Sequence, residues 1–528
     1  MRNTMRKIFI IVMLIVPLLL GRERDTQRFA ESTQGMIVTS TPEAAEAGLE
    51  MFRIGGNAID AAASVAFALM VTDPAMCSFG GRSQILIRLS DGRSLGIDGA
   101  TESPAEVYEP AGTGHGYKTV PVPGSPAALE DMIRRFGNLP LPVVIQPAID
   151  LAKNGIIISH EYEQVFIKYG DTFTRYPGTI KHFLNKNGKF YIEGDRFVQN
   201  ALAKTLEMFA NAGSVSLYRG ELAAAIINDM NKNAGLISSA DLKRYRPHSG
   251  KVLEGKYRGF RVISRGGQCD GASVIEMLNL LESYDLASFS LTDFRYIALL
   301  AQVNHIAYMD EYLPDWIQTA PATTERRRRE IRLEEPFPVT VRQESELPEG
   351  ETNHLSVIDK EGNAVSITQS IGPYFGSKVV NPELGFFYAY SYDMNDDPVP
   401  CQREKTSQSP TIVVDGYRPF LVIGSAGSSR IPGSIVQTII NVIDHKMDLY
   451  KAVSSPRVFL LKDELRLENS AIHDTTIHRL EQLGYCVRTY TDLNGWFGRV
   501  HAIQVVNGDE LKMRGAADPR DDGAALGY

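Results

Sequence analysis

A threonine in the middle of the chain, Thr352, has the sequence features of a latent nucleophile. It lies between a polar, irregular stretch that ends at Glu351 and an alternating segment that begins at Asn353. Cutting the bond between Glu351 and Thr352 would place a free α-amine beside the hydroxyl. With a reference pKa of about 7.7–8.0, such an amine is partly neutral near pH 7 and can accept the hydroxyl proton. We predict self-cleavage between these residues, with Thr352 as nucleophile and its amine as base.

A glycine- and serine-rich segment, Gly424 to Arg430, offers the second component of acyl transfer. It joins a predicted strand, Pro419 to Ile423, to a predicted helix from about Pro432 to Asp444. Backbone N–H groups at such a helix start have no intrahelical acceptor and can stabilise an oxyanion. Gly427 and Ser428 are the predicted donors, although many strand-to-helix turns of this composition only connect two elements.

Two other patterns compete with Thr352. Gly267 to Gly271 fits the G-x-C-x-G outline of a nucleophile elbow around Cys269, but only a short strand-like run precedes it and no histidine lies nearby. His354 is two residues after Thr352 on the same strand face, about 7 Å further along. We interpret it as a core histidine that forms hydrogen bonds, and not as the base.

No metal site or cofactor is predicted. Three aspartates, Asp393, Asp396 and Asp397, lie close together, but no histidine or glutamate completes a ligand set. The four cysteines are widely scattered and contain no C-x-x-C pair, which is typical of neither a disulfide scaffold nor a zinc site. Buried free thiols are the favoured interpretation.

Composition limits the classes of partner. The chain has 528 residues, 43% of them apolar and 22% charged, which suits one very large domain or two ordinary ones. A formal net charge of -8, without a basic segment interleaved with aromatic residues, argues against nucleic acid as a partner.

The N-terminus predicts export. Basic residues precede an unbroken apolar run from Ile8 to Leu20, which is shorter than the roughly 20 residues that span a bilayer. Residues 1–21 therefore form a signal peptide or, because the cleavage site after Gly21 is poor, a short membrane tether. The predicted location is the extracellular face of the cell envelope.

Before Thr352 the patterns predict a hairpin sheet with many helices on it and no repeated βαβ unit. The expected strands are Met36–Thr39, Gln84–Leu89 and Ser94–Ile97, and the expected helices are Thr41–Ile54, Ala58–Val71, Leu141–Asn154, Asn200–Ala212, Glu221–Asn233 and Leu291–Tyr308. Asn57 is the expected cap of the second, alanine-rich helix, which must pack closely against its neighbours.

Around the predicted cleavage site the composition changes twice. Thr319 to Glu351 includes the charge run Thr323–Glu330 and several prolines, and it is predicted to be exposed and mobile, a natural place for chain scission. The arginines of this run could attract a polyanion, but a solvated surface is the commoner explanation. From Leu355 to Gln369 the two-residue period predicts a hairpin with its turn at Glu361–Asn363.

Several segments together resemble the γ-glutamyltransferase family. They are Thr352–Val357, Asp359–Val365, Ser409–Val413, Gly424–Ile431, Gly515–Arg520, Glu46–Ala62 and Val120–Gly124. The similarity extends from Gly35 to Tyr528 and the combination is highly specific.

The resemblance implies an α+β fold of the N-terminal-nucleophile class, an αββα sandwich in which two stacked antiparallel sheets lie between helical layers. One autocleaved chain would supply both subunits, residues 22–351 as the large one and residues 352–528 as the small one. By position, Thr406 and Ser407 would hold the glutamyl α-carboxylate, and Ser370 would support the nucleophile.

This chain also departs from the family pattern. The family's arginine for the donor α-carboxylate falls at Ala100, and its asparagine after the hairpin falls at Gly372. In the acidic region that reads the donor α-amine, only Asp393 keeps a charge. A glutamate inside a γ-linked polymer has no free α-amine, so we expect such a polymer to fit this site better than glutathione.

Further substrate contacts are expected from Ser429, Arg430 and Arg520, because arginine binds carboxylates bidentately. For Arg520, pairing with a neighbouring aspartate is an equally good interpretation.

Within the family, the closest resemblance is to members that act on capsule poly-γ-glutamate. The expected enzyme cleaves this polymer and transfers chains to an amine, that of peptidoglycan, or to water. Two alternatives stay open: a glutathione-type transferase, hydrolase or side-chain acylase, and an inactive relative that serves as an envelope scaffold.

Overall fold

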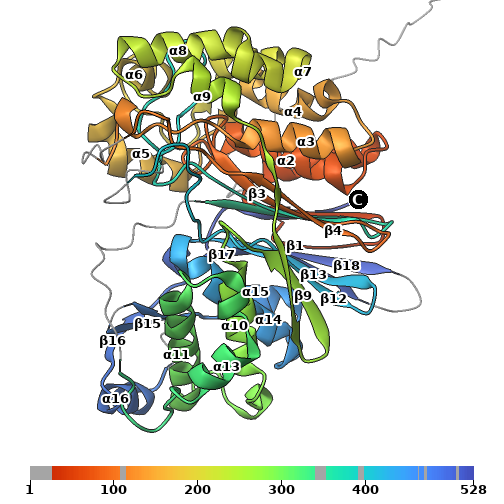
Figure 1. Ribbon diagram of the computed structural model, residues 1–528, viewed down its shortest axis with the longest axis vertical. Helices are drawn as coiled ribbons and strands as arrows, with labels where there is room; N and C mark the ends of the chain where they lie inside the picture. Colours follow the sequence, from red (N-terminus) through yellow and green to blue (C-terminus); the bar gives the residue numbers. More distant parts are fainter. Residues whose placement is uncertain are drawn as a thin grey trace, which may run out of the picture.

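A computed structural model describes residues 27–107, 114–338, 352–390, 398–461, 463–468, 472–506 and 511–528. Two seven-stranded antiparallel sheets stack face to face between two layers of helices (Figure 1). This αββα sandwich confirms the predicted fold class.

The first sheet has the strand order β19 (Ala524–Gly527), β2 (Gly35–Thr39), β10 (Asn353–Asp359), β11 (Ala364–Ser370), β3 (Arg82–Arg88), β4 (Ser94–Gly99) and β7 (His248–Gly250). The second has the order β1 (Phe29–Ser32), β18 (Lys512–Ala517), β17 (Arg499–Val506), β13 (Arg418–Ala426), β12 (Thr411–Asp415), β9 (Phe260–Arg265) and β8 (Val252–Tyr257). Small apolar residues and side chains such as Val38, Leu86 and Val422 fill the space between the sheets.

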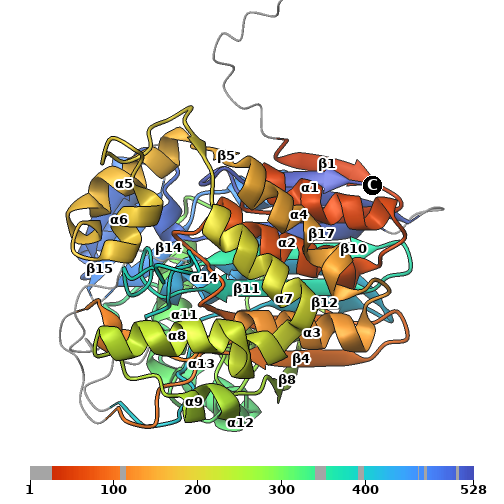
Figure 2. The same ribbon diagram turned by 90° about the horizontal axis from the view of Figure 1, so that it is seen from above.

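Helices from the first half of the chain cover the outer face of the first sheet (Figures 1 and 2). They are α1 (Pro42–Arg53), α2 (Ala58–Thr72), α3 (Ser125–Phe136), α4 (Leu141–Asn154), α5 (His160–Phe173), α6 (Pro177–Phe183), α7 (Asn200–Arg219), α8 (Glu221–Lys232) and α9 (Ser239–Arg244). The pair β5 (Ile156–Ile157) and β6 (Arg196–Phe197) lies among them.

The opposite layer covers the second sheet (Figure 1). It contains α10 (Gly271–Leu281), α11 (Phe294–Asp310), α12 (Asp315–Gln318), α13 (Pro321–Arg328), α14 (Ile431–Ile443), α15 (Leu449–Ser454) and α16 (Asp474–Gln482). A small sheet of β14 (Val458–Leu461), β15 (Glu464–Glu468) and β16 (Cys486–Tyr490) completes it. No helix in the described ranges is both long enough and apolar enough to cross a bilayer.

Helix α2 supports the strand that follows Thr352. Asn57 caps it as predicted, accepting hydrogen bonds from the amides of Ile59 and Asp60 while the Asp60 carboxylate accepts one from Asn57. Every residue of the helix is buried. Its alanines allow the helix to pack closely on β10 and β11, so the prediction from its composition is confirmed.

The charge run before the predicted cleavage site is partly ordered, which corrects the prediction for Thr319–Glu351. Residues of the run form α13, in which Thr323 and Thr324 are buried. Arg327 pairs with Asp310 of α11. A buried helix face and a fixed ion pair hold this segment against the protein. Residues 339–351, Glu351 among them, lie outside the described residues.

Candidate active site

Thr352 lies directly before β10, and its side chain is almost fully buried, with 5% of the residue exposed. Asn353 pairs with Gln369 on β11, so the next pair outward is Thr352 and Ser370. The Ser370 hydroxyl accepts a hydrogen bond from the Gly372 amide at 2.9 Å. Strand register therefore brings Ser370 beside the predicted nucleophile.

His354 shows which way the Thr352 side chain is directed. Its Nδ1 is 2.9 Å from the Thr368 hydroxyl and its Nε2 is 3.1 Å from the Ser356 hydroxyl. The ring lies against Gly424 of the second sheet, where a Cβ would approach it within 2.2 Å. Because side chains alternate along a strand, Thr352 shares this inner face. Its full burial and two hydrogen bonds confirm the interpretation as a core histidine, and burial lowers the pKa of His354 well below its usual value.

The loop after β13 carries the two predicted oxyanion donors and has an unusual backbone. Gly427 has a φ of 136° and Ser428, a non-glycine residue, has a φ of 52°. Neither backbone amide donates a hydrogen bond to any residue that the structure describes. Strained backbone persists only where its surroundings hold it, and it concentrates at functional sites. The two amides are thus available to an external acceptor.

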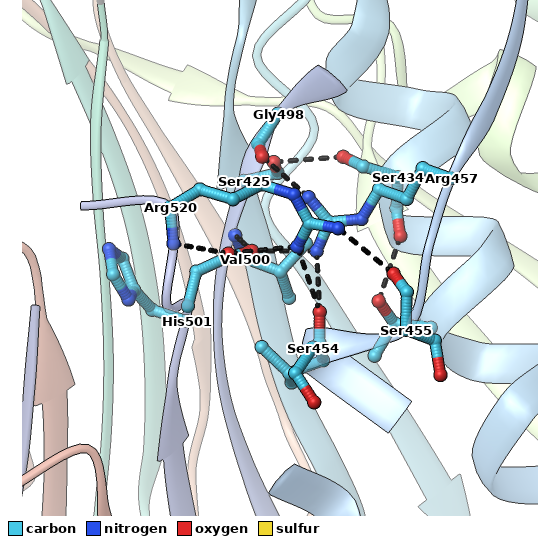
Figure 3. A network of polar contacts seen from close by, with 12 residues as sticks. Ser425, Ser434, Ser454, Ser455, Arg457, Gly498, Val500, His501 and Arg520 are labelled. Carbon is cyan, nitrogen blue, oxygen red and sulfur yellow. Dashed lines mark hydrogen bonds and ion pairs between the residues drawn. The ribbon is translucent and has the colours of Figure 1, made fainter. Parts of the chain in front are cut away.

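Gly498 is the support beneath this loop. A Cβ on Gly427 would lie 2.8 Å from the Gly498 Cα. On its other side Gly498 is enclosed by Ser425 and Ser434, whose hydroxyls are 2.8 Å apart (Figure 3). The Gly498 carbonyl accepts a hydrogen bond from Arg457. The loop therefore packs against Gly498, whose own surroundings leave it little room to move.

Arg520 belongs to the same network (Figure 3) and pairs there with an aspartate, the alternative that the sequence left open beside a role as substrate ligand. Its fully buried guanidinium lies 3.0 Å from Asp518 and 2.8 Å from Glu468. Asp518 also pairs with Arg457 at 2.6 Å and accepts from the Val500 amide at 2.7 Å. The two arginines and these hydrogen bonds outweigh burial and hold the pKa of Asp518 far below its usual value.

The other predicted substrate contacts that the structure describes lie in two places. Thr406 and Ser407 line a cavity of about 100 Å³ with Asp270, Glu311, Tyr312 and Lys405. Arg430 is 1% exposed, with its guanidinium over the Trp496 ring and its Nε donating to the Trp496 carbonyl at 2.9 Å. The hydroxyl of Ser429, the residue before Arg430, is also buried. Asp393 lies outside the described residues. These assignments stay predictions.

The two departures from the family pattern have a local structural context. Ala100 is 2% exposed at the end of β4. Gly372 has a φ of 92°, and a Cβ there would lie 2.3 Å from the Tyr390 carbonyl oxygen. No side chain fits at position 372 unless the backbone of Tyr390 moves.

The cysteines divide into two classes. Cys269 is buried, and loss of hydration raises its pKa to about 12, so the thiolate that a nucleophile elbow requires is disfavoured. Cys77 is also buried and receives a hydrogen bond from Asn353 at 3.3 Å. Cys401 and Cys486 are exposed, which corrects the prediction that all four thiols are buried.

Sequence reasoning did not identify an acidic cavity that is linked to Asn353, the residue after the predicted nucleophile. It has a volume of about 60 Å³, and its lining includes Asp73, Glu161, Arg499, Asp521 and Asp522. Asp73 receives a hydrogen bond from the side chain of Asn353, which links the cavity to the residue after Thr352. Burial is the main cause that raises the pKa of Asp73 to about 7 and that of Glu161 to about 8. Only the folded structure assembles these acids, which are distant in sequence.

Comparison with known proteins identifies the family. The family model described as Gamma-glutamyltranspeptidase matches residues 44–528. The chain belongs to the gamma-glutamyltranspeptidase family. It is thus a member of an enzyme family with γ-glutamyl transfer and hydrolysis as its chemistry.

Similar proteins within the family differ in the activities that their names state. The chain is 31% identical to the glutathione hydrolase proenzyme of Escherichia coli (strain K12), over 97% of this chain and 95% of that protein. It is 34% identical to the acylase ACY 1 proenzyme of Pseudomonas sp. (strain SE83), over 84% of this chain and 85% of that protein. The crystal structure of cephalosporin acylase from Bacillus halodurans superposes with a TM-score of 0.86 and 25% identity, covering 98% of this chain and 99% of that one.

The transpeptidase CapD of Bacillus anthracis also matches, with 25% identity over 54% of this chain and a TM-score of 0.48. A superposition at this level carries no argument about the substrate. Family membership is therefore established by the family model and by the full-length relatives.

Proposed function

We propose that the protein is an exported, self-processing γ-glutamyl acyltransferase with Thr352 as its nucleophile. Residues 1–21 serve as signal peptide or membrane tether, residues 22–351 form the large subunit and residues 352–528 the small one. The observation that carries the proposal is the position of Thr352: it is buried beside Ser370, on the inner sheet face, at the edge where β10 begins.

Processing follows from the same hydroxyl. The Thr352 oxygen attacks the carbonyl carbon of Glu351, and the acyl group moves from nitrogen to oxygen, which frees the α-amine. Water then hydrolyses this ester, leaving a Glu351 carboxylate and the restored hydroxyl. Each proenzyme name among the relatives is consistent with this route.

The catalytic cycle repeats this chemistry on a substrate. The Thr352 amine takes the hydroxyl proton, and the oxygen attacks the γ-carbonyl of the donor. The amides of Gly427 and Ser428 donate to the developing oxyanion. Collapse transfers the proton to the leaving amine and leaves a γ-glutamyl ester on Thr352. Water or an acceptor amine then attacks the ester and regenerates the enzyme.

Poly-γ-glutamate is the proposed donor. Ala100 and Gly372 offer no polar side chain for the free ends of a single glutamate. A glutamate within the polymer has its α-amine acylated, so it does not require an amine-binding group. A polymer outside the cell also fits the export predicted from residues 1–21.

A side-chain acylase is the second candidate. Its support is the full-length similarity to the two acylases named above. Both candidates share the acylated threonine and differ in the acyl group that the site accepts.

Transfer to an amine has its own support in the acidic cavity. Carboxyl groups of Asp73, Glu161 and Asp521 line this space, and Asp73 contacts Asn353. A cationic acceptor, such as a free amine of peptidoglycan, would favour the ionised form of Asp73 and Glu161, whose pKa values burial raises, and would pair with the carboxylates that result.

The test begins with N-terminal sequencing and intact mass of the purified full chain. We expect a fragment of 177 residues, the difference between 528 and 351, that begins at Thr352. Thr352→Ala should remain one whole chain, whereas Thr352→Ser should still be cut because it keeps a hydroxyl. Steady-state kcat/KM is then compared for poly-γ-glutamate, glutathione and glutaryl-p-nitroanilide. A strong preference for glutathione would contradict the polymer as substrate, and a preference for the glutaryl compound would favour the acylase.

A further inference from the structure

Arg82 lies level with Thr352, two strands away in the same sheet. It is the register partner of Ser370 across β3 and β11, and Ser370 is in turn the position opposite Thr352. Neighbouring strands are about 4.8 Å apart, so the Arg82 Cα is roughly 10 Å from that of Thr352. The three residues therefore share one end of three adjacent strands.

The side chain of Arg82 is on the inner face of the sheet. Gln84, two residues further along β3, donates to Asp98 at 2.7 Å and accepts from Arg265 of the second sheet at 2.8 Å. Residues two apart on a strand point the same way. Arg82 thus shares the face of Thr352 and His354.

The guanidinium of Arg82 is buried without a hydrogen-bond or ion-pair partner among the described residues. The residue is 9% exposed, and within the described ranges it forms no hydrogen bond or ion pair; its Nε is completely covered. Loss of hydration lowers its pKa, and the field of Glu404 only partly offsets this. Leaving a buried charge uncompensated is costly. This environment favours an anion brought by a ligand.

Another arginine on the same strand face shows the usual arrangement. Arg88, six residues along β3, is also buried, but it donates to the carbonyls of Gly92 and Tyr417 and to the Ser94 hydroxyl. Among the residues that the structure describes, Arg88 therefore has acceptors and Arg82 has none. The arginine without an acceptor is the one at the start of β3, the strand end nearest Thr352.

We propose that Arg82 binds a free carboxylate of the acyl donor while Thr352 attacks the carbonyl at the donor's other end. In a γ-glutamyl or glutaryl group, four carbon–carbon bonds separate these carbons, about 5 Å when extended. Two side chains anchored roughly 10 Å apart can span such a group. Ala100 follows Gly99, the last residue of β4 and the partner of Ser83, so it continues the register opposite Arg82 and adds only a methyl group.

This inference rests on the proposed function and defines its donor class: acyl groups with a carboxylate four bonds from the reacting carbonyl, whether or not an α-amine is free. Interior units of poly-γ-glutamate, glutaryl amides and γ-glutamyl amides belong to this class. Butyryl amides, which lack the carboxylate, do not.

Three p-nitroanilides provide the test on the processed enzyme: N-acetyl-γ-glutamyl, glutaryl and butyryl. A hydrogen-bonded charge pair contributes about 1.5–3 kcal/mol, so Arg82→Gln should lower kcat/KM for the first two about 10- to 150-fold. The value for the butyryl compound should change less than about twofold. Arg82→Lys should retain part of the discrimination. Arg88→Lys, about 20 Å away on the same strand face, is the matched control.

Each outcome decides between the assignments. An equal loss on all three anilides would mean that Arg82 supports the fold, and it would overturn the inference. If Arg82→Gln is not cut before Thr352, the glutaryl-to-butyryl ratio is measured on Arg82→Lys. If neither variant is processed, the inference is overturned. If processed wild-type enzyme cleaves no anilide and no polymer, the proposed function fails instead.

Discussion

The backbone at Gly427 allows a quantitative prediction for Gly427→Ala. A Cβ at this position would lie 2.8 Å from the Gly498 Cα, whereas ordinary contact begins at 3.4 Å. Ser425 and Ser434 lie close to Gly498 and Arg457 donates a hydrogen bond to its carbonyl, so we expect Gly498 to keep its position. The loop that carries the Gly427 and Ser428 amides must therefore shift by about 0.6 Å, the difference between the two distances.

Such a shift is large for an oxyanion donor. Effective donors lie about 2.7–3.1 Å from the oxyanion, and an added 0.6 Å places one of them beyond hydrogen-bond distance. Losing one donor costs on the order of 10²–10³ in kcat. We expect Gly427→Ala to lower kcat by this factor while KM changes little, because the interaction forms mainly in the transition state. Stability should fall by about 1–3 kcal/mol, since a φ of 136° strains an alanine.

The assay measures nitroaniline release from glutaryl-p-nitroanilide, normalised to the fraction of chains cut before Thr352. Gly416→Ala is the matched control, since Gly416 also has a positive φ, 57°, but a Cβ added there would meet no atom within 4 Å. Gly416→Ala should lose stability and keep its kcat. If the kcat of Gly427→Ala stays within about threefold of the control, the loop does not form the oxyanion site as described.

Three further outcomes are expected. Thr352→Ala should remain a single chain without anilide hydrolysis, as seen by intact mass and by absorbance. Arg520→Met leaves buried Glu468 and Asp518 without one shared partner and should cost roughly 3–5 kcal/mol in urea unfolding, whereas Arg93→Met, at an exposed ion pair, should cost less than about 1 kcal/mol. Because burial raises the pKa of Asp73 to about 7, the folded state holds this proton more tightly than the unfolded state, and the stabilisation is lost as pH rises from about 4 to about 7. Asp73→Asn should therefore gain Tm relative to wild type between pH 5 and pH 8; a constant difference would contradict this.

Local signals predicted much of the scaffold. The Asn57 cap fixed the start of α2, and Leu141–Asn154 coincides with α4. The hairpin that follows Thr352 was predicted from its two-residue period, and Gly362, with a φ of 88°, lies in its turn. Each of these features depends on residues close together in the chain, so their physical causes can be read from a short window.

Contacts between distant segments explain which features the sequence could not predict. The charge run is a helix because Arg327 finds Asp310 across a helix interface. Arg520 is fixed by Glu468, which belongs to a different small sheet. The position of Arg82 beside Ser370 depends on the pairing of β3 with β11. Nothing in the immediate sequence of these three arginines distinguishes a structural partner from a ligand partner.

The strand order of the two sheets has a consequence for the cut protein. In the first sheet, β10 lies between β2 and β11, so a strand from before position 352 flanks a strand that begins just after it. In the second sheet, β9 from the first part pairs with β12 from the second. After scission the two pieces remain hydrogen-bonded partners within both sheets, and neither piece retains a complete sheet. They should melt in one cooperative transition, and refolding from separated fragments should require both at once.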